Sequence, residues 1–170
     1  MEYDEVFANV KARILEGMVF HDEMTRYFDF LTLYGYRDKQ RKQYEEETEG
    51  YIKLCDYYQH HYNKLIPHTP MERPDVIPES WYMYTRQDVD PNTKKQSVKS
   101  ALKKWEEWES ETRDIYEDMC GELLNNGEIA SARFLMEYVD DVDAELCRVT
   151  NHRIHLESIG YDLSFILSEQ

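Results

Sequence analysis

The spacing of helix breakers constrains this chain most, because it divides the sequence into four long stretches of helical periodicity. The first break falls at Tyr34-Gly35-Tyr36 and the last at Asn125-Asn126-Gly127. All five prolines lie between residues 66 and 92, which form the only long stretch without helical character. A helix pair, a long crossover and a second helix pair predict an all-α, up-down four-helix bundle, with the crossover running the length of the bundle.

The apolar periodicity and the breakers give the bounds of the predicted helices. We expect one domain of 170 residues. Its helices should span residues 3–33, 37–66, 93–124 and 128–167, with the crossover over residues 67–92. Thr93 or Ser97 is expected to cap the third helix, and Gly160 to end or bend the fourth.

Composition and charge exclude several classes of protein. The net charge of −15, from 35 acidic and 20 basic residues, argues against direct nucleic-acid binding, which needs a basic surface. No apolar run approaches the roughly 18 residues of a membrane span, and the acidic N-terminus does not resemble a secretory signal. Cys55, Cys120 and Cys147 form no CxxC pair and are expected to be reduced thiols. These features predict a cytoplasmic protein that has no membrane partner.

Four polar side chains fall on or beside the apolar faces of the predicted helices, at related heights. His21 lies 14 positions before Gly35 and Glu47 lies 12 after it, whereas Glu109 and Asp143 each lie 17 positions from Asn126. A crossover that spans the bundle makes the second and third helices parallel. The four side chains are therefore predicted to share one layer of the bundle, about one helical turn or roughly 5 Å deep.

Buried carboxylates need a proton, a positive neighbour, water or a metal cation. Carboxylates combined with an imidazole suit iron, manganese or zinc, so His21, Glu47, Glu109 and Asp143 are the candidate metal ligands. The alternative is structural: these side chains turn toward solvent or bond to tyrosine hydroxyls, which the same helix faces also carry, for example at Tyr116.

A few short windows of the sequence resemble ferritins. Residues 46–54, EETEGYIKL, are similar to the stretch of the second ferritin helix in which a metal-binding Glu-x-x-His motif precedes a Lys-Leu pair. Residues 101–109, the Asn125-Asn126-Gly127 turn and residues 134–137, FLME, resemble the third helix, turn and fourth helix. The resemblance implies the ferritin-like fold and a carboxylate metal centre in the bundle core. It also implies iron handling or metal-centred oxidation.

The metal motif departs from the ferritin pattern. Glu47 takes the place of the bridging acid, but Gly50 stands where the histidine is expected. The fourth helix offers Asp140-x-x-Asp143 instead of Glu-x-x-His, and the first helix is expected to turn His21 inward and Glu23 away. These departures argue against a standard ferroxidase centre, and the sequence assigns no catalytic residue.

The acidic charge supports a second functional hypothesis. An acidic helical bundle can occupy a basic surface, so the alternative is a non-catalytic protein that binds a basic protein partner, such as an inhibitor that mimics nucleic acid. Within the crossover, the aromatic run Trp81-Tyr82-Met83-Tyr84 either pins the connection to the bundle or anchors a partner. The sequence leaves the oligomeric state, including a homo-oligomer, open.

Overall fold

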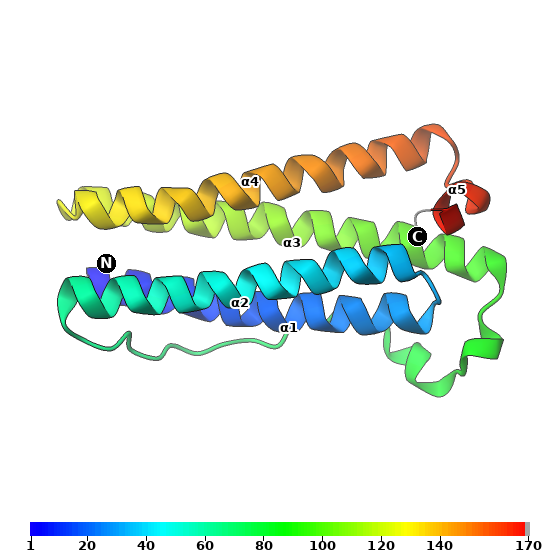
Figure 1. The fold of residues 1–170 in the computed structure, drawn as a ribbon, viewed down its shortest axis with the longest axis horizontal. Coiled ribbons are helices and arrows are strands. Elements are labelled where there is room, and N and C mark those ends of the chain that lie inside the picture. Colours follow the sequence, from blue (N-terminus) through cyan, green and yellow to red (C-terminus); the bar gives the residue numbers. More distant parts are fainter. Residues whose placement is uncertain (169–170) are drawn as a thin grey trace.

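A computed structural model describes residues 1–168, which form a bundle of four long helices followed by one short helix (Figure 1). The long helices are α1 (Tyr3–Phe30), α2 (Tyr34–Tyr62), α3 (Pro91–Asn125) and α4 (Ile129–Ser158), and the short helix is α5 (Leu163–Ser168). The crossover contains two short 3-10 helices, η1 (Glu79–Met83) and η2 (Arg86–Asp88). Residues 1–168 include no β-strand and no helix long and apolar enough to cross a membrane.

The path of the chain confirms the predicted topology. α1 and α2 form one antiparallel hairpin, and α3 and α4 form the other (Figure 1). Between them the crossover returns along the outside of the first hairpin, so α2 and α3 run in the same direction (Figure 1). The prediction of an up-down four-helix bundle with a long crossover is therefore confirmed.

The first turn lies earlier than the sequence predicted. α1 ends at Phe30 rather than at residue 33, and Gly35 lies inside α2. Thr32 adopts the left-handed conformation, with φ of 60°, and the amide of Leu33 closes the turn by donating to the carbonyl oxygen of Phe28 at 2.9 Å. Leu33 and the neighbouring Leu31 are fully buried. The apolar contacts on both sides of the turn place it here, although Thr32 is less suited to a positive φ than glycine.

The other helix ends also differ from the predicted bounds. α2 ends at Tyr62, four residues early, because Asn63 turns the chain with φ of 57°. α4 ends at Ser158 and not at residue 167, because Gly160 and Tyr161 both have positive φ. The following segment folds back as α5. The turn after α3 is as predicted, with Gly127 at φ of 75°.

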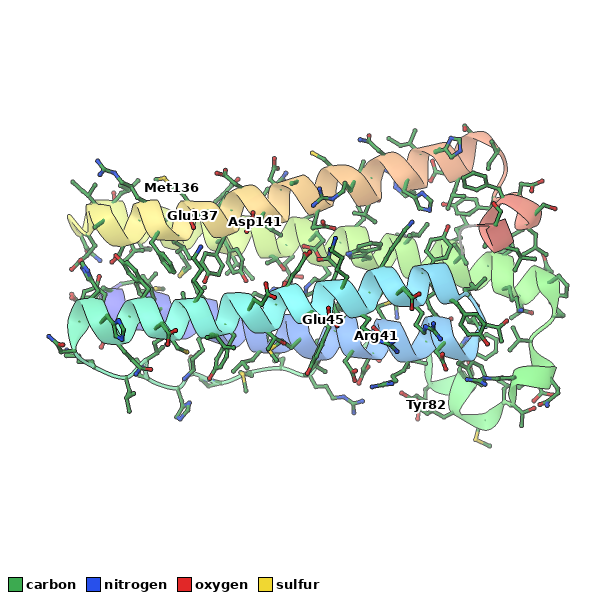
Figure 2. All side chains as sticks on the ribbon, in the orientation of Figure 1. Arg41, Glu45, Tyr82, Met136, Glu137 and Asp141 are labelled. Atoms are coloured by element: carbon green, nitrogen blue, oxygen red, sulfur yellow. The ribbon has the colours of Figure 1, made fainter. Side chains whose placement is uncertain are left out.

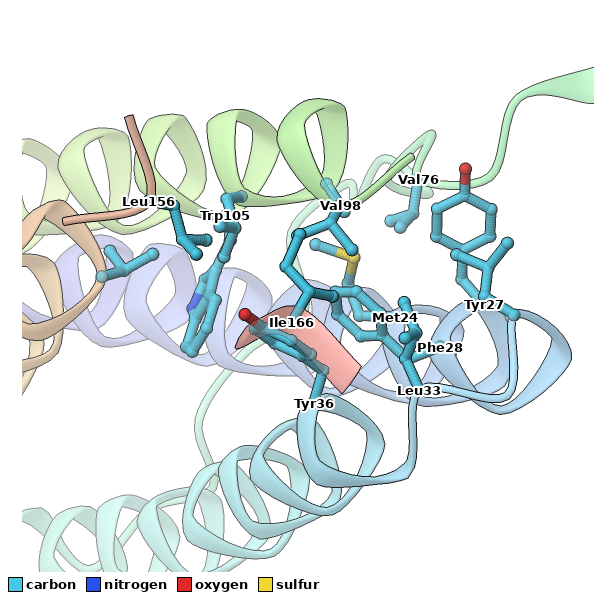
Figure 3. Close-up of a cluster of buried hydrophobic side chains, with 14 of the residues drawn as sticks. Met24, Tyr27, Phe28, Leu33, Tyr36, Val76, Val98, Trp105, Leu156 and Ile166 are labelled. Carbon is cyan, nitrogen blue, oxygen red and sulfur yellow. The ribbon is translucent and has the colours of Figure 1, made fainter. Parts of the chain in front are cut away.

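The core consists of two apolar clusters, one toward each end of the bundle. Figure 3 shows the cluster beside the α1–α2 turn, which includes Met24, Phe28, Tyr36, Val98 and Leu156. The cluster at the other end is built around Phe7, Leu54, Tyr58, Leu123 and Leu135. Between the two clusters the helices bring polar side chains together.

The aromatic run in the crossover divides into two roles. Trp81 packs against Tyr27 and Phe30, with ring centroids 6.4 and 5.8 Å away, and so holds the crossover to α1. Tyr82, which Figure 2 labels, is 65% exposed, and Met83 is 86% exposed.

The cap of α3 differs from the predicted Thr93 or Ser97, and it can be tested. Asp90 is the N-cap and accepts a hydrogen bond from the Thr93 amide at 2.7 Å, with Pro91 in the first turn. We expect Asp90→Ala to lower the free energy of unfolding by about 1 kcal/mol, as measured by urea denaturation. Asp90→Asn keeps a side-chain oxygen that can accept the capping hydrogen bond, so its free energy of unfolding should fall much less. Equal losses in both variants would show that the cap does not stabilise α3.

Candidate functional site

His21 and Glu109 form a buried ion pair in the middle of the bundle. α1 supplies His21 and α3 supplies Glu109, and the side chains are 0% and 3% exposed. His21 Nε2 lies 3.3 Å from Glu109 Oε1, and Trp105 Nε1 donates a hydrogen bond to the same oxygen at 3.3 Å. The sequence prediction that these two residues face the core at the same height agrees with this contact.

Gln40 of α2 fixes the orientation of the imidazole. Its Oε1 lies 2.7 Å from His21 Nδ1, and because a carbonyl oxygen only accepts, Nδ1 carries a proton. His21 Nε2 makes no aligned hydrogen bond despite its contact with Glu109. Gln40 is fully buried and was not predicted, although it lies seven residues before Glu47 on the same face of the helix.

Glu47 approaches this pair from α2 and packs against Gly17 of α1. A methyl group on Gly17 would lie 3.3 Å from the Glu47 carboxyl group, so the glycine leaves the space that Glu47 occupies. The side chain is half-buried, and this burial raises its pKa to about 7, although the charge of His21 opposes the shift. Near neutral pH, Glu47 can therefore be either a carboxylate or a carboxylic acid.

The pKa of His21 reflects a balance between burial and charge. Burial alone would lower it, because the imidazolium loses its hydration. The close contact with Glu109 and the negative charges of Glu109 and Glu47 outweigh burial, so the net shift is upward. His21 thus tends to be protonated while both carboxylates are charged.

Arg13 adds a second positive group that sequence reasoning did not identify. Its guanidinium carbon lies 3.5 Å from the centre of the Trp108 ring, and its Nε donates to Thr112 Oγ1 at 2.9 Å. The side chain is 7% exposed. Arg13, Gly17 and His21 follow each other at four-residue intervals on α1, which is the pattern that could have revealed them as one face.

Asp143 is not part of this cluster. The buried positions of α4 include Leu135, Val142 and Val149, which follow a seven-residue spacing. Asp143 lies one residue beyond Val142, about 100° around the helix, and this turns it to the surface. There it is exposed and pairs with Arg113 of α3, with 3.3 Å between Nη1 and Oδ1. The predicted layer therefore contains His21, Glu47 and Glu109 without Asp143.

A groove between α2 and α4 leads from the surface to the cluster. The backbones of these two helices stay apart along the middle of the bundle (Figure 1). The groove has a volume of about 580 Å³, and Glu47, Glu109 and Tyr116 are among its lining residues. Burial raises the pKa of Glu46 on the α2 side, and the charges of Glu145 and Asp141 raise it further. Acids of the two helices therefore face each other across the groove.

The residue types of the His21, Glu47 and Glu109 cluster suit a metal ion, but their present positions do not bring them close enough to bind one together. An imidazole with an unaligned Nε2 and two carboxylates are ligands that iron, manganese and zinc accept. However, no group of three or more His, Cys, Asp or Glu side chains in residues 1–168 is placed so that it could hold a metal ion. A cation would bind His21, Glu47 and Glu109 together only if these side chains drew closer.

Comparison with solved structures places the fold among the ferritins. A humanized archaeal ferritin matches with a TM-score of 0.77 and 20% identity over 97% of this chain and 90% of that chain. The open-pore ferritin from the archaeon Archaeoglobus fulgidus matches with a TM-score of 0.77 and 19% identity over 97% and 91% of the two chains. A PmFTN variant soaked in iron matches with a TM-score of 0.72 and 14% identity over 99% and 96%.

These matches confirm the predicted ferritin-like fold. At 14–20% identity, the likeness concerns the fold alone. No protein-family model matches the sequence, and a comparison with curated proteins likewise found no match.

Two helix-interior glycines offer a test of the contact between Gly17 and Glu47. Around Gly121 of α3 an added methyl group would meet no atom within 4 Å, so Gly121→Ala should raise the free energy of unfolding by about 0.5–1 kcal/mol through helix propensity. Gly17→Ala should raise the free energy of unfolding by less, because the Glu47 carboxyl group must move to make room for the new methyl group. Urea denaturation of both variants measures the difference. Equal gains would mean that Glu47 does not press against α1.

The raised pKa of Glu47 predicts how stability depends on pH. The folded value of about 7 lies above the ordinary value of 4.5, so the folded state holds a proton that the unfolded state releases. This carboxylate destabilises the fold above pH 7, and the penalty disappears as pH falls to 4.5 and below. Glu47→Gln should therefore raise the free energy of unfolding by about 2 to 3 kcal/mol at pH 8 and by about 1 kcal/mol at pH 5.5.

The matched control for this measurement is Glu45→Gln, the same change at an exposed position of α2 (Figure 2). Its effect should be small and the same at both pH values. A Glu47→Gln effect that does not vary with pH would contradict the burial of a titrating carboxyl group.

Proposed function

We propose that this chain is a metal-binding protein of the ferritin-like fold, in which His21, Glu47 and Glu109 bind one metal ion in the bundle core. The observation that carries the proposal is the convergence of an imidazole and two carboxylates from three helices at one level. His21 Nε2 and Glu109 Oε1 are already 3.3 Å apart, with Gln40 holding the far side of the ring. A carbonyl partner on the second nitrogen is typical of metal-binding histidines.

Charge supports the same proposal. Burial, and to a smaller extent the charge of Glu109, raises the pKa of Glu47, whereas the nearby carboxylates raise the pKa of His21. A divalent cation would replace the protons on these two side chains, so metal binding should release protons and weaken as pH falls. The open groove between α2 and α4 gives a route for the ion from solvent to Glu47 and Glu109.

Iron is the first metal to test, with manganese and zinc as the alternatives. Structures of PmFTN variants soaked in iron share this fold, which makes iron a reasonable expectation for this chain. The donor set is also compatible with manganese and zinc. Iron handling would then be the role of the protein. The present residues assign no catalytic step.

Other predictions from the sequence remain open. Asp143 is paired with Arg113 at the surface, and we leave it out of the proposed ligand set. A basic protein partner, a homo-oligomer and a cytoplasmic location stay predictions.

Metal binding is tested by equilibrium dialysis against Fe²⁺ without oxygen, and separately against Mn²⁺ and Zn²⁺, followed by elemental analysis. We expect about one equivalent of bound metal in the wild type. Glu109→Gln should bind at least about tenfold more weakly, whereas Glu45→Gln should bind like the wild type. Less than about a tenth of an equivalent of every metal in the wild type would overturn the proposal.

Thermal melts add a test that does not depend on affinity. Glu47→Gln should stabilise the protein in chelator, because it removes a buried charge, and should lower the stabilisation that added metal gives, because it removes a ligand. The same stabilisation of wild type and variant by metal would mean that Glu47 is not a ligand.

A further inference from the structure

The groove between α2 and α4 is strongly acidic along its whole length. Seven carboxylates line it, against two basic side chains, Lys53 and Arg148. On α4 the acids form a row at four-residue intervals, which sets neighbouring side chains about 6 Å apart along one face of the helix. Figure 2 labels two of its members, and the row consists of Glu137, Asp141 and Glu145.

Both basic side chains are already engaged by acids of this row. Lys53 Nζ lies 2.6 Å from Glu137 Oε2, and Arg148 Nε donates to Glu145 Oε1 at 2.8 Å. Asp141 has no ion-pair partner in the described chain, and neither does Glu49 on the opposite wall. The groove therefore keeps an excess of negative charge on both walls.

Two residues that line the floor of the groove have a side-chain oxygen atom that accepts no hydrogen bond from the described residues. Tyr116 is 4% exposed and lines the groove, yet its hydroxyl group makes no hydrogen bond within residues 1–168. Glu109 is 3% exposed, and its contacts with His21 and Trp105 use only Oε1, which leaves Oε2 without a donor. Neither oxygen is among the fully buried, unpartnered atoms of the described residues, so both can accept a hydrogen bond from water or from a ligand.

The shape and lining of the groove favour an extended ligand over a compact ion. The acids are spread along the helices, and no three of the described His, Cys, Asp or Glu side chains are placed to share one metal ion. Val142, Ala144 and the ring of Tyr138 lie among the acids and offer apolar surface. A volume of about 580 Å³ suits a small molecule.

We propose that this groove binds a linear aliphatic polyamine, a chain of ammonium groups separated by short methylene segments. The ammonium groups would lie against Asp141, Glu145 and the acids of α2, with the methylene segments on the apolar side chains. Ammonium N–H groups would also donate to the Tyr116 hydroxyl and to Glu109 Oε2. Asp141 and Glu145 are not proposed metal ligands, whereas Glu47 and Glu109 line the groove and are also proposed to bind the metal.

Titration calorimetry with spermidine at low ionic strength tests the proposal, with Mg²⁺ at the same ionic strength as the comparison. Spermidine should bind at least about tenfold more tightly than Mg²⁺, because it reaches several separated acids at once. The double variant Asp141→Asn/Glu145→Gln should weaken spermidine binding by at least about tenfold. Mg²⁺ binding as tight as spermidine would show a general counter-ion effect and overturn the proposal.

The matched control is Glu107→Gln/Asp118→Asn, which removes two exposed charges of α3 outside the groove. It changes the net charge equally and should weaken spermidine binding by less than about twofold, since distant surface charges are screened. Equal weakening in both double variants would overturn the proposal. Tyr116→Phe should weaken spermidine binding by about fivefold, because the hydroxyl acceptor is lost. An unchanged affinity would contradict a hydrogen bond from the ligand to Tyr116.

His21→Gln separates the two proposals. This change removes a proposed metal ligand, whereas His21 does not line the groove. Spermidine binding by this variant should equal that of the wild type, and its metal binding should be lost. Loss of spermidine binding in a variant with an unchanged circular dichroism spectrum would contradict a separate polyamine site.

Discussion

The burial of charge in the middle of the bundle is the constraint on which the rest of this structure depends. His21 and Glu109 lie between two apolar clusters that together would otherwise make one continuous core. An unpaired charge at this depth would cost several kcal/mol, so each polar group requires another. Gln40 holds the imidazole, Trp105 donates to Glu109, and Arg13 lies over Trp108 nearby. The three helices that supply these groups are thereby fixed in register.

The polar layer lies where the bundle is open on one side, between α2 and α4. α1 packs closely with α2, and α3 with α4, but α2 and α4 remain apart where Glu47 enters. A half-buried Glu47 keeps some contact with solvent, which a fully closed apolar interface would deny it. Tyr138, which donates to the carbonyl oxygen of Gly50 at 2.7 Å, bridges the two helices at one end of the groove. The groove is thus an extension of the polar interior to the surface.

The two proposed ligands differ in how they use negative charge. A metal ion needs several donors around one point, and only the core cluster brings an imidazole and carboxylates near one another. A polyamine needs charges distributed along a line, as the acids of α2 and α4 are. Glu109 belongs to both environments, because its Oε1 contacts His21 and the residue also lines the groove. Occupation of one site should therefore change the electrostatic potential at the other.

The sequence by itself determined the order of the helices, the long crossover and the four-helix bundle, because apolar periodicity and helix breakers are local signals. The resemblance of short windows to ferritins added the ferritin-like fold. The sequence also determined that His21 and Glu109 face the core, since both interrupt apolar rows. Only the tertiary structure decided the rest. Asp143 turns outward because a one-residue difference moves a side chain about 100° around a helix, and periodicity does not resolve such a step reliably. Arg13 and Gln40 were missed because polar residues become buried only when other helices supply their partners.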